Sequence, residues 1–143
     1  MRNILVVDGN SIINRAFYGI RLLTAKDGTY TNAVYGFMNM FFKMLSSERP
    51  TYVAVAFDLK APTFRHKMYP EYKATRQKTP EDLHAQVPII EEILTAFGVT
   101  TIRQDGFEAD DLIATIAHQC KKQNRECHPH KILLFRGWLF CNQ

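Results

Sequence analysis

Short apolar runs along the chain predict the strands of a buried sheet. Continuous apolar runs lie at residues 4–7 and 52–57. VTTI at residues 99–102 predicts a third strand, and KILLF at residues 131–135 could form a fourth. A run that is apolar throughout is typical of a strand covered on both faces, as in a parallel sheet. Stretches with helical periodicity separate these runs, so we expect an α/β fold with a mostly parallel central sheet.

Helices are predicted where apolar residues recur every three or four positions. Residues 33–45 carry such a stripe, with Thr31 or Asn32 as the N-cap. Residues 80–97 carry a second stripe, for which Thr79 is the expected N-cap, and Pro88 inside it favours a kink or a break. A third stripe covers residues 108–122, and a short helix at 11–18 follows the first strand.

Acidic residues stand at the ends of two predicted strands. Asp8 follows the run at 4–7, and Asp58 follows the run at 52–57. If these strands are parallel neighbours, both carboxylates emerge at the edge where open α/β sheets bind ligands. An alternative for Asp8 is a purely structural role, as the cap of the next helix.

A third group of acids opens the helix at residues 108–122. Glu108, Asp110 and Asp111 stand together in the stretch GFEADD. Helical spacing places Glu108 and Asp111 on one face and points Asp110 away from them. The alternative is that these acids only complement the helix dipole. Clustered anions repel one another, however, and a hard cation such as Mg²⁺ or Mn²⁺ relieves that repulsion.

The five acids therefore come from three distant parts of the chain to one expected sheet edge. Two divalent ions about 3.5–4 Å apart can activate a water and stabilise the leaving oxygen of a phosphodiester. The acid pattern thus predicts metal-dependent phosphodiester hydrolysis.

A basic segment at about residues 59–79 complements these acids. Six cationic residues and the single acid Glu71 give it a charge of +5, against +4 for the whole chain. Phe64, Tyr69 and Tyr72 are interleaved with the cations, which suits a nucleic-acid strand because rings stack on bases and cations hold phosphates. A solvated loop is the alternative. Arg15 lies one helical face above Asp8, where it can meet an anion.

Composition narrows the setting. The chain has 143 residues, of which 46% are apolar and 22% charged, as expected of one globular domain. It contains no apolar run long enough to span a bilayer and no signal-peptide pattern, so we expect a cytoplasmic protein without a membrane partner. Its three cysteines are an odd number, which favours free thiols.

Several motifs resemble the N-terminal 5′→3′ exonuclease domain of bacterial DNA polymerase I, a member of the flap endonuclease family. The resemblance covers residues 3 to about 120. The motifs are VDGNS at 7–11, RAFY at 15–18, TNAVYGF at 31–37, AFDLKAPTFRH at 56–66, EYKATR at 71–76 and GFEADD at 106–111.

This resemblance implies a PIN-like three-layer fold and a 5′→3′ exonuclease and flap endonuclease that acts on DNA in replication and repair. The DNA would be a 5′ flap or a nicked or primed duplex. It also implies Mg²⁺ or Mn²⁺ as cofactor, with two ions in the complete domain. The catalytic and metal-binding residues would be Asp8, Asp58, Glu108, Asp110 and Asp111. The DNA-binding residues would be Arg15, Lys60, Phe64, Arg65, Tyr72, Lys73 and Arg76, with the last three on the family's helical arch.

The chain also departs from the family. No strand ending in Gly-Asp-Arg/Lys-Asp follows Asp111, and the helix–hairpin–helix region and the polymerase domain are absent. We therefore expect residues 1–122 to be the first part of the nuclease domain, truncated and incomplete at its C-terminus. Residues 123–143 would be an atypical tail, which a shift of reading frame would explain. Two alternatives follow: a catalytically impaired, nucleic-acid-binding remnant without the second metal site, and, ranked lower, a PIN-like endoribonuclease.

Overall fold

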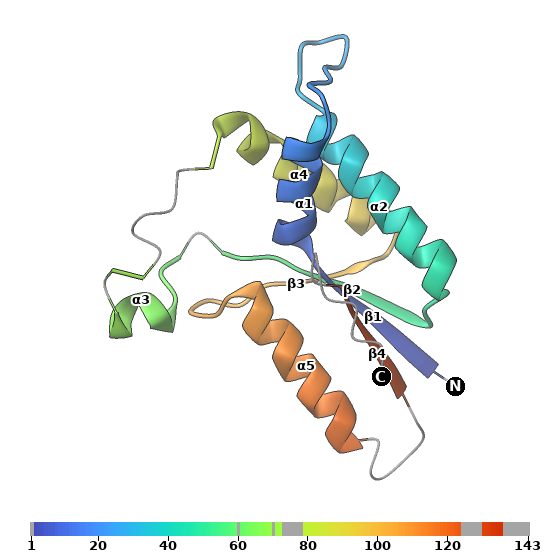
Figure 1. The fold of residues 1–143 in the computed structure, drawn as a ribbon, viewed down its shortest axis with the longest axis vertical. Coiled ribbons are helices and arrows are strands. Elements are labelled where there is room, and N and C mark those ends of the chain that lie inside the picture. Colours follow the sequence, from blue (N-terminus) through green and yellow to red (C-terminus); the bar gives the residue numbers. More distant parts are fainter. Residues whose placement is uncertain (1, 60, 70, 73–78, 124–129, 136–143) are drawn as a thin grey trace.

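Strands and helices alternate along the chain, as the apolar pattern predicted (Figure 1). A computed structural model describes residues 2–59, 61–69, 71–72, 79–123 and 130–135. In chain order the elements are β1 (Arg2–Asp8), α1 (Gly9–Gly19), α2 (Asn32–Glu48), β2 (Tyr52–Ala56), α3 (Phe64–Met68), α4 (Glu81–Ala96), β3 (Thr100–Ile102), α5 (Ala109–Gln123) and β4 (His130–Phe135).

The described strands form one parallel sheet in the order β3-β2-β1-β4. β1 lies between β2 and β4, and its register pairs Val7 with Val55 and Asp8 with Ala56. β3 continues the sheet beyond β2, where Ile102 pairs with Ala56. Every pairing is parallel, so the carboxyl ends of the strands meet at one edge. The fourth predicted strand is confirmed as β4.

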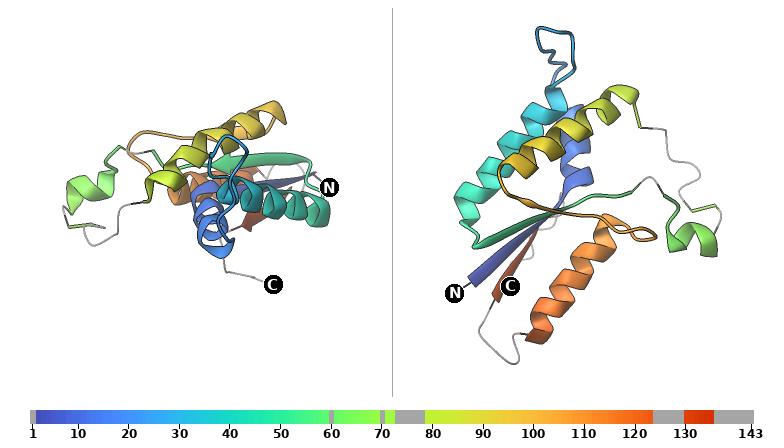
Figure 2. Two further views of the ribbon diagram at one scale, coloured as in Figure 1. Left: turned by 90° about the horizontal axis from the view of Figure 1, so that it is seen from above. Right: turned by 180° about the vertical axis from the view of Figure 1, so that it is seen from behind.

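Helices cover both faces of the sheet and complete three layers. α1, α2 and α4 lie on one face, and α5 lies on the other (Figures 1 and 2). The alternation of side chains along β1 serves both layers. Leu5 and Val7 are buried in the core beneath α1, α2 and α4, whereas Val6 is buried with Ala109 and Leu112 of α5. Residues 4–7 of β1 are all apolar because both faces of the strand are covered there.

The start of α2 is held by a buried polar side chain from α4. Gln86 is 0% exposed, and its Oε1 accepts hydrogen bonds from the amides of Ala33 at 2.8 Å and Val34 at 3.3 Å. Its Nε2 donates to Oδ1 of Asn32 at 3.1 Å. Thr31, one of the two expected caps, occupies the N-cap position without a side-chain cap bond. Gln86 therefore caps α2 from a distant part of the chain.

α4 differs from the prediction in two details. Its N-cap is Pro80 rather than Thr79, because the amides of Leu83 and His84 donate to the Pro80 carbonyl, both at 3.1 Å. Pro88 lies inside a continuous helix and does not break it. Pro88 is exposed, so the carbonyl that lacks a helical donor there lies on the water-facing side of α4.

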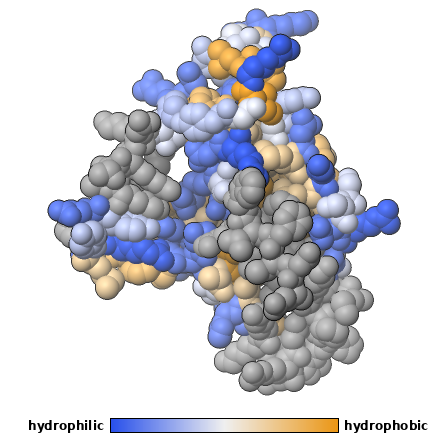
Figure 3. All heavy atoms as spheres, viewed as in Figure 1, coloured by the Kyte–Doolittle hydropathy of each residue, from blue (hydrophilic) through white to orange (hydrophobic). Residues whose placement is uncertain are grey.

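The described surface is mainly hydrophilic on the face drawn in Figure 3, and apolar side chains gather there over the loop between α1 and α2. Tyr18 and Leu22 are among the exposed large apolar residues. Within the described part of the chain, no helix combines the length and the apolar character needed to cross a membrane.

Candidate metal centre

Asp8 and Asp58 lie at the same edge of the sheet, as predicted from the two parallel strands. Asp8 ends β1 and is also the N-cap of α1, since its Oδ1 accepts a hydrogen bond from the amide of Ser11 at 3.0 Å. Asp8 therefore caps α1 and also lies at the sheet edge, so the two interpretations of this residue are compatible. The cap moves the start of α1 to Gly9, two residues earlier than expected.

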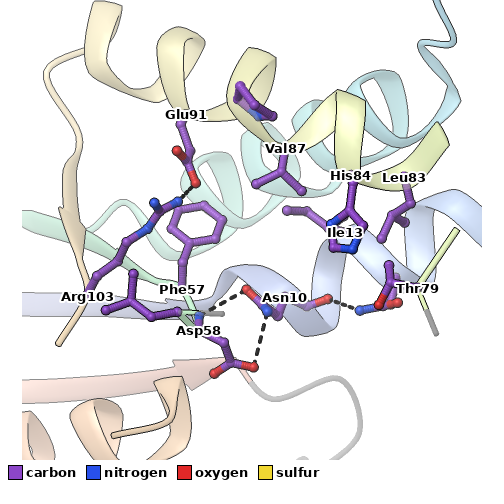
Figure 4. Close-up of a pocket in the computed structure, with 13 residues that line it drawn as sticks. Asn10, Ile13, Phe57, Asp58, Thr79, Leu83, His84, Val87, Glu91 and Arg103 are labelled. Carbon is purple, nitrogen blue, oxygen red and sulfur yellow. Dashed lines mark hydrogen bonds and ion pairs between the residues drawn. The ribbon is translucent and has the colours of Figure 1, made fainter. Parts of the chain in front are cut away.

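Asn10 joins the ends of β1 and β2, a role that was not predicted from the sequence. Its Nδ2 donates to Oδ2 of Asp58 at 3.1 Å, and its Oδ1 accepts from the amide of Asp58 at 3.2 Å (Figure 4). The paired bonds fix the Asp58 carboxylate beside the start of α1. An asparagine two residues after a strand-end acid was visible as part of a turn, but its partner lies 48 residues away.

α5 is held to the same place through its first amide. The backbone N–H of Ala109 donates to Oδ1 of Asp58 at 2.7 Å. The third acidic group, Glu108 to Asp111, therefore lies at the start of α5 and not at the end of β3, because a loop over residues 103–108 separates the two elements. Gly106, with a φ of 82°, allows the turn in that loop.

Four of the five predicted acids line one cavity of about 530 Å³. None of the described residues that line it carries a positive charge. The four acids are Asp8, Asp58, Glu108 and Asp110, and the other lining residues are Asn10, Ser11, Asn14, Tyr18, Thr79 and Ala109.

Asp111 is the fifth predicted acid, and it does not line this cavity. Its carboxylate accepts two hydrogen bonds from Arg65, at 2.7 and 2.6 Å. Glu108 and Asp111 share a partner, as expected of acids on one face, because the guanidinium of Arg65 binds Asp111 and lies 3.7 Å from Oε2 of Glu108. Asp110 lines the cavity together with Glu108, whereas Asp111 does not.

The predicted DNA-binding residues are divided between described and undescribed parts of the chain. Phe64 and Arg65 lie on α3, and the Tyr72 hydroxyl donates to Oε2 of Glu108 at 3.3 Å. The Asp111 hydrogen bonds are the main cause that raises the pKa of Arg65 above its ordinary range. Arg15 is exposed on α1 and is not among the described residues lining the cavity. Lys60, Lys73 and Arg76 lie outside the described residues.

A second cavity, of about 500 Å³, adjoins the first (Figure 4). Both are lined by Asn10, Asn14, Asp58 and Thr79. The second is otherwise mostly apolar, with Ile13, Phe57, Leu59, Leu83, Val87 and Pro88 in its walls, together with His84 and the ion pair of Glu91 and Arg103. Asp58 therefore stands between an acidic chamber and a more apolar one.

The chemistry of the acidic cavity fits a hard divalent cation. Its four carboxylates supply oxygen donors, and Mg²⁺ and Mn²⁺ prefer oxygen ligands. In the described part of the chain, no three carboxylate, imidazole or thiol groups are near enough to one another to hold one ion. The donor atoms are thus of the type that the ion prefers. They lie farther apart than the ligands of a single bound ion do.

Comparison with known proteins gives the family. The family model of the 5′–3′ exonuclease, N-terminal resolvase-like domain, matches residues 3–130. DNA polymerase I of Bacillus subtilis is 45% identical over 125 residues, and that of Mycobacterium bovis is 46% identical over 136 residues. These alignments cover 87% and 94% of this chain. The chain spans about 14% of the length of either relative.

Solved structures give the same fold. A bacteriophage T5 flap endonuclease, determined as a pseudo-enzyme–product complex with DNA and metal ions, aligns with a TM-score of 0.62 at 22% identity. A T5 5′-exonuclease with bound zinc aligns with a TM-score of 0.60 at 22% identity. Each alignment covers 93% of this chain and 48% of the T5 protein.

These findings confirm the predicted resemblance and the PIN-like fold. The family match also extends eight residues beyond residue 122, the expected end of the nuclease part. The chain belongs to the family of 5′–3′ exonuclease N-terminal, resolvase-like domains that includes the matching region of bacterial DNA polymerase I.

Proposed function

We propose that this chain is part of a divalent-metal-dependent 5′→3′ exonuclease and flap endonuclease of the DNA polymerase I type. The observation that carries the proposal is the cavity lined by four carboxylates from three separate segments. Oxygen donors gathered in this way suit a hard divalent cation, which also offsets the repulsion among them. Family membership gives independent support.

The proposed ligands of Mg²⁺ or Mn²⁺ are Asp8, Asp58, Glu108 and Asp110. When bound, such ions activate a water and stabilise the leaving oxygen of a phosphodiester, and two ions are proposed for the complete domain. The chain itself orients the ligands. Asn10 and the Ala109 amide fix the two oxygens of Asp58, and the Ser11 amide fixes Oδ1 of Asp8.

The proposed substrate is DNA with a 5′ end, as a flap or a nicked or primed duplex, and a cytoplasmic site of action is part of the proposal. Lys60, Lys73 and Arg76 are proposed phosphate contacts because the segment that contains them has a net charge of +5. Phe64 and Tyr72 are proposed to stack on bases. Phe64 is partly exposed, at 38%. Arg15 is proposed to contact a phosphate beside the cavity.

A cleavage assay tests this function. The full chain is mixed with a 5′-labelled flap substrate and Mg²⁺, and cleavage is compared with that in the presence of a chelator. Asp58→Asn is expected to lower the rate on the order of 10²-fold, as does the removal of one electrostatic interaction in other active sites. Asp27→Asn is the matched control, because Asp27 is an exposed acid in the loop between α1 and α2. Equal rates for the two variants, or cleavage without metal, would refute the proposal.

A second candidate is a remnant that binds nucleic acid without cutting it. The wide spacing of the carboxylates in the described part of the chain favours it, because no three of them converge on one ion. Binding of the flap substrate with no cleavage in Mg²⁺ or Mn²⁺ would support this candidate. A comparison of RNA and DNA substrates of the same sequence would reveal a preference for RNA.

A further inference from the structure

α3 is docked on the acidic turn that opens α5. Arg65 of α3 donates from Nη1 to Oδ2 of Asp111 at 2.7 Å and from Nη2 to Oδ1 at 2.6 Å. The same guanidinium lies 3.7 Å from Oε2 of Glu108. A bidentate arginine–carboxylate pair is both strong and directional, so it fixes the orientation of α3 as well as its distance from α5.

Contacts on either side of this ion pair support the docking. The amide of Phe64 donates to the carbonyl of Gly106 at 3.0 Å, and the rings of Phe64 and Phe107 are 5.8 Å apart. α3 itself is capped by a reciprocal pair of bonds between Thr63 and His66. The docked surface therefore includes the backbone, an aromatic pair and an ion pair.

Asp111 has little capacity left for another partner. Each of its oxygens accepts from Arg65, and Oδ2 also accepts from the amide of Glu108 at 3.0 Å. Its side chain is 21% exposed, and that of Arg65 is 32% exposed. Partial burial makes an ion pair less subject to screening than a surface pair. The remaining acids face the cavity that Asp111 does not line.

We infer that Arg65 and Asp111 are positioning residues: their ion pair anchors the start of the basic segment and holds Glu108 at the cavity. Asp111 is then not a metal ligand, and Arg65 is not primarily a phosphate contact. This inference rests on the proposed function, because Glu108 is a proposed ligand there. The position of the basic segment and the position of the cavity carboxylates then depend on each other through α3.

The inference is tested with Arg65→Met, Asp111→Asn and the double variant of the full chain. The readouts are hydrogen exchange of residues 63–69 and 106–111 and the Kd for Mn²⁺, measured without DNA. Both single variants are expected to speed exchange in both segments and to weaken Mn²⁺ binding by about 10-fold, as for other residues that orient metal ligands. The double variant should be within about 2-fold of either single one, because both remove the same ion pair.

Two further variants keep the test decisive. Arg65→Lys retains the charge but not the bidentate geometry, so it should give smaller changes in the same segments even if Arg65→Met fails to fold. Arg103→Met removes another arginine–carboxylate pair, with Glu91, and should leave exchange at residues 63–69 unchanged.

The inference is overturned if Asp111→Asn weakens Mn²⁺ binding far more than Arg65→Met, since Asp111 would then be a direct ligand. Additive effects, or exchange that stays as in the parent chain, would overturn it as well. Failure of the proposed function is a separate result. In that case Asp58→Asn would leave Mn²⁺ affinity unchanged, while hydrogen exchange would still decide whether the ion pair anchors α3.

Discussion

At the scale of single residues, Asp58 connects the three segments of the candidate metal centre. One of its oxygens accepts from Asn10 on α1 and the other from the first amide of α5. Such hydrogen bonds to a carboxylate are stronger than neutral ones and orient its lone pairs. The placement of the site thus depends on a few partly buried polar contacts between distant residues, and contacts of this kind are sensitive to single substitutions.

Gln86 offers a test of such a contact away from the site. Gln86→Leu should lower the free energy of unfolding by about 1–3 kcal/mol, because the amide of Ala33 loses its buried acceptor. Urea unfolding of the purified chain measures the change. Glu92→Leu introduces the same side chain at an exposed position of α4 and should change stability by less than about 0.5 kcal/mol. Equal losses in the two variants would show that Gln86 does not stabilise α2.

At the scale of elements, the start of α1 is packed tightly against the end of β2. Gly9 is buried, and a Cβ there would overlap the ring of Phe57, which directly precedes Asp58. Gly19, at the other end of α1, has open space where its Cβ would be. A side chain is therefore excluded at Gly9 but can be accommodated at Gly19.

Gly9→Ala should destabilise the chain by about 1–3 kcal/mol, because the added methyl must displace Phe57. Gly19→Ala should leave stability unchanged or raise it by up to about 1 kcal/mol, since alanine is the better helix former. Thermal unfolding compares the two, and adding Mn²⁺ reports on Asp58 through the rise in Tm. A stable Gly9→Ala variant with an undiminished Mn²⁺ effect would contradict the role given to this packing.

The elements show what could be predicted from the sequence. β1 and β2 were predictable because strands covered on both faces are apolar throughout, and parallel pairing then placed Asp8 and Asp58 at one edge. The pairing of Arg65 with Asp111 was not predictable, because the partners lie 46 residues apart. Each also had another expected partner, DNA for Arg65 and a metal ion for Asp111. Gln86 was missed for a similar reason, since a polar residue on a predicted helix gives no sign of its hydrogen-bond partners, which here are the amides of Ala33 and Val34.

At the scale of the whole molecule, charge is distributed unevenly. The basic segment carries +5, so the rest of the chain sums to −1, given the total of +4. Carboxylates gather at the described cavity beside the start of this segment. Under the proposed function, the basic segment would hold the phosphates of a DNA strand while the acids at the cavity bind cations.

Salt dependence of DNA binding tests this distribution. Replacing Lys73 and Arg76 by Gln should weaken binding of a single strand and reduce the slope of log K against log salt by about 0.7 for each phosphate that is no longer neutralised. Replacing Lys26 and Lys43 by Gln removes the same charge from other parts of the chain and should change the slope less. Fluorescence anisotropy over a salt series measures both. Identical slopes would place the DNA elsewhere on the molecule.

The central position of β1 has a consequence for synthesis. The strand made first pairs with β4, the last described strand, while β2 can join its other side much earlier. A nascent chain therefore carries β1 with one open edge until residue 135 has left the ribosome. Open strand edges pair readily with other chains. We therefore expect chaperones to bind this part of the chain mainly in the interval before β4 emerges.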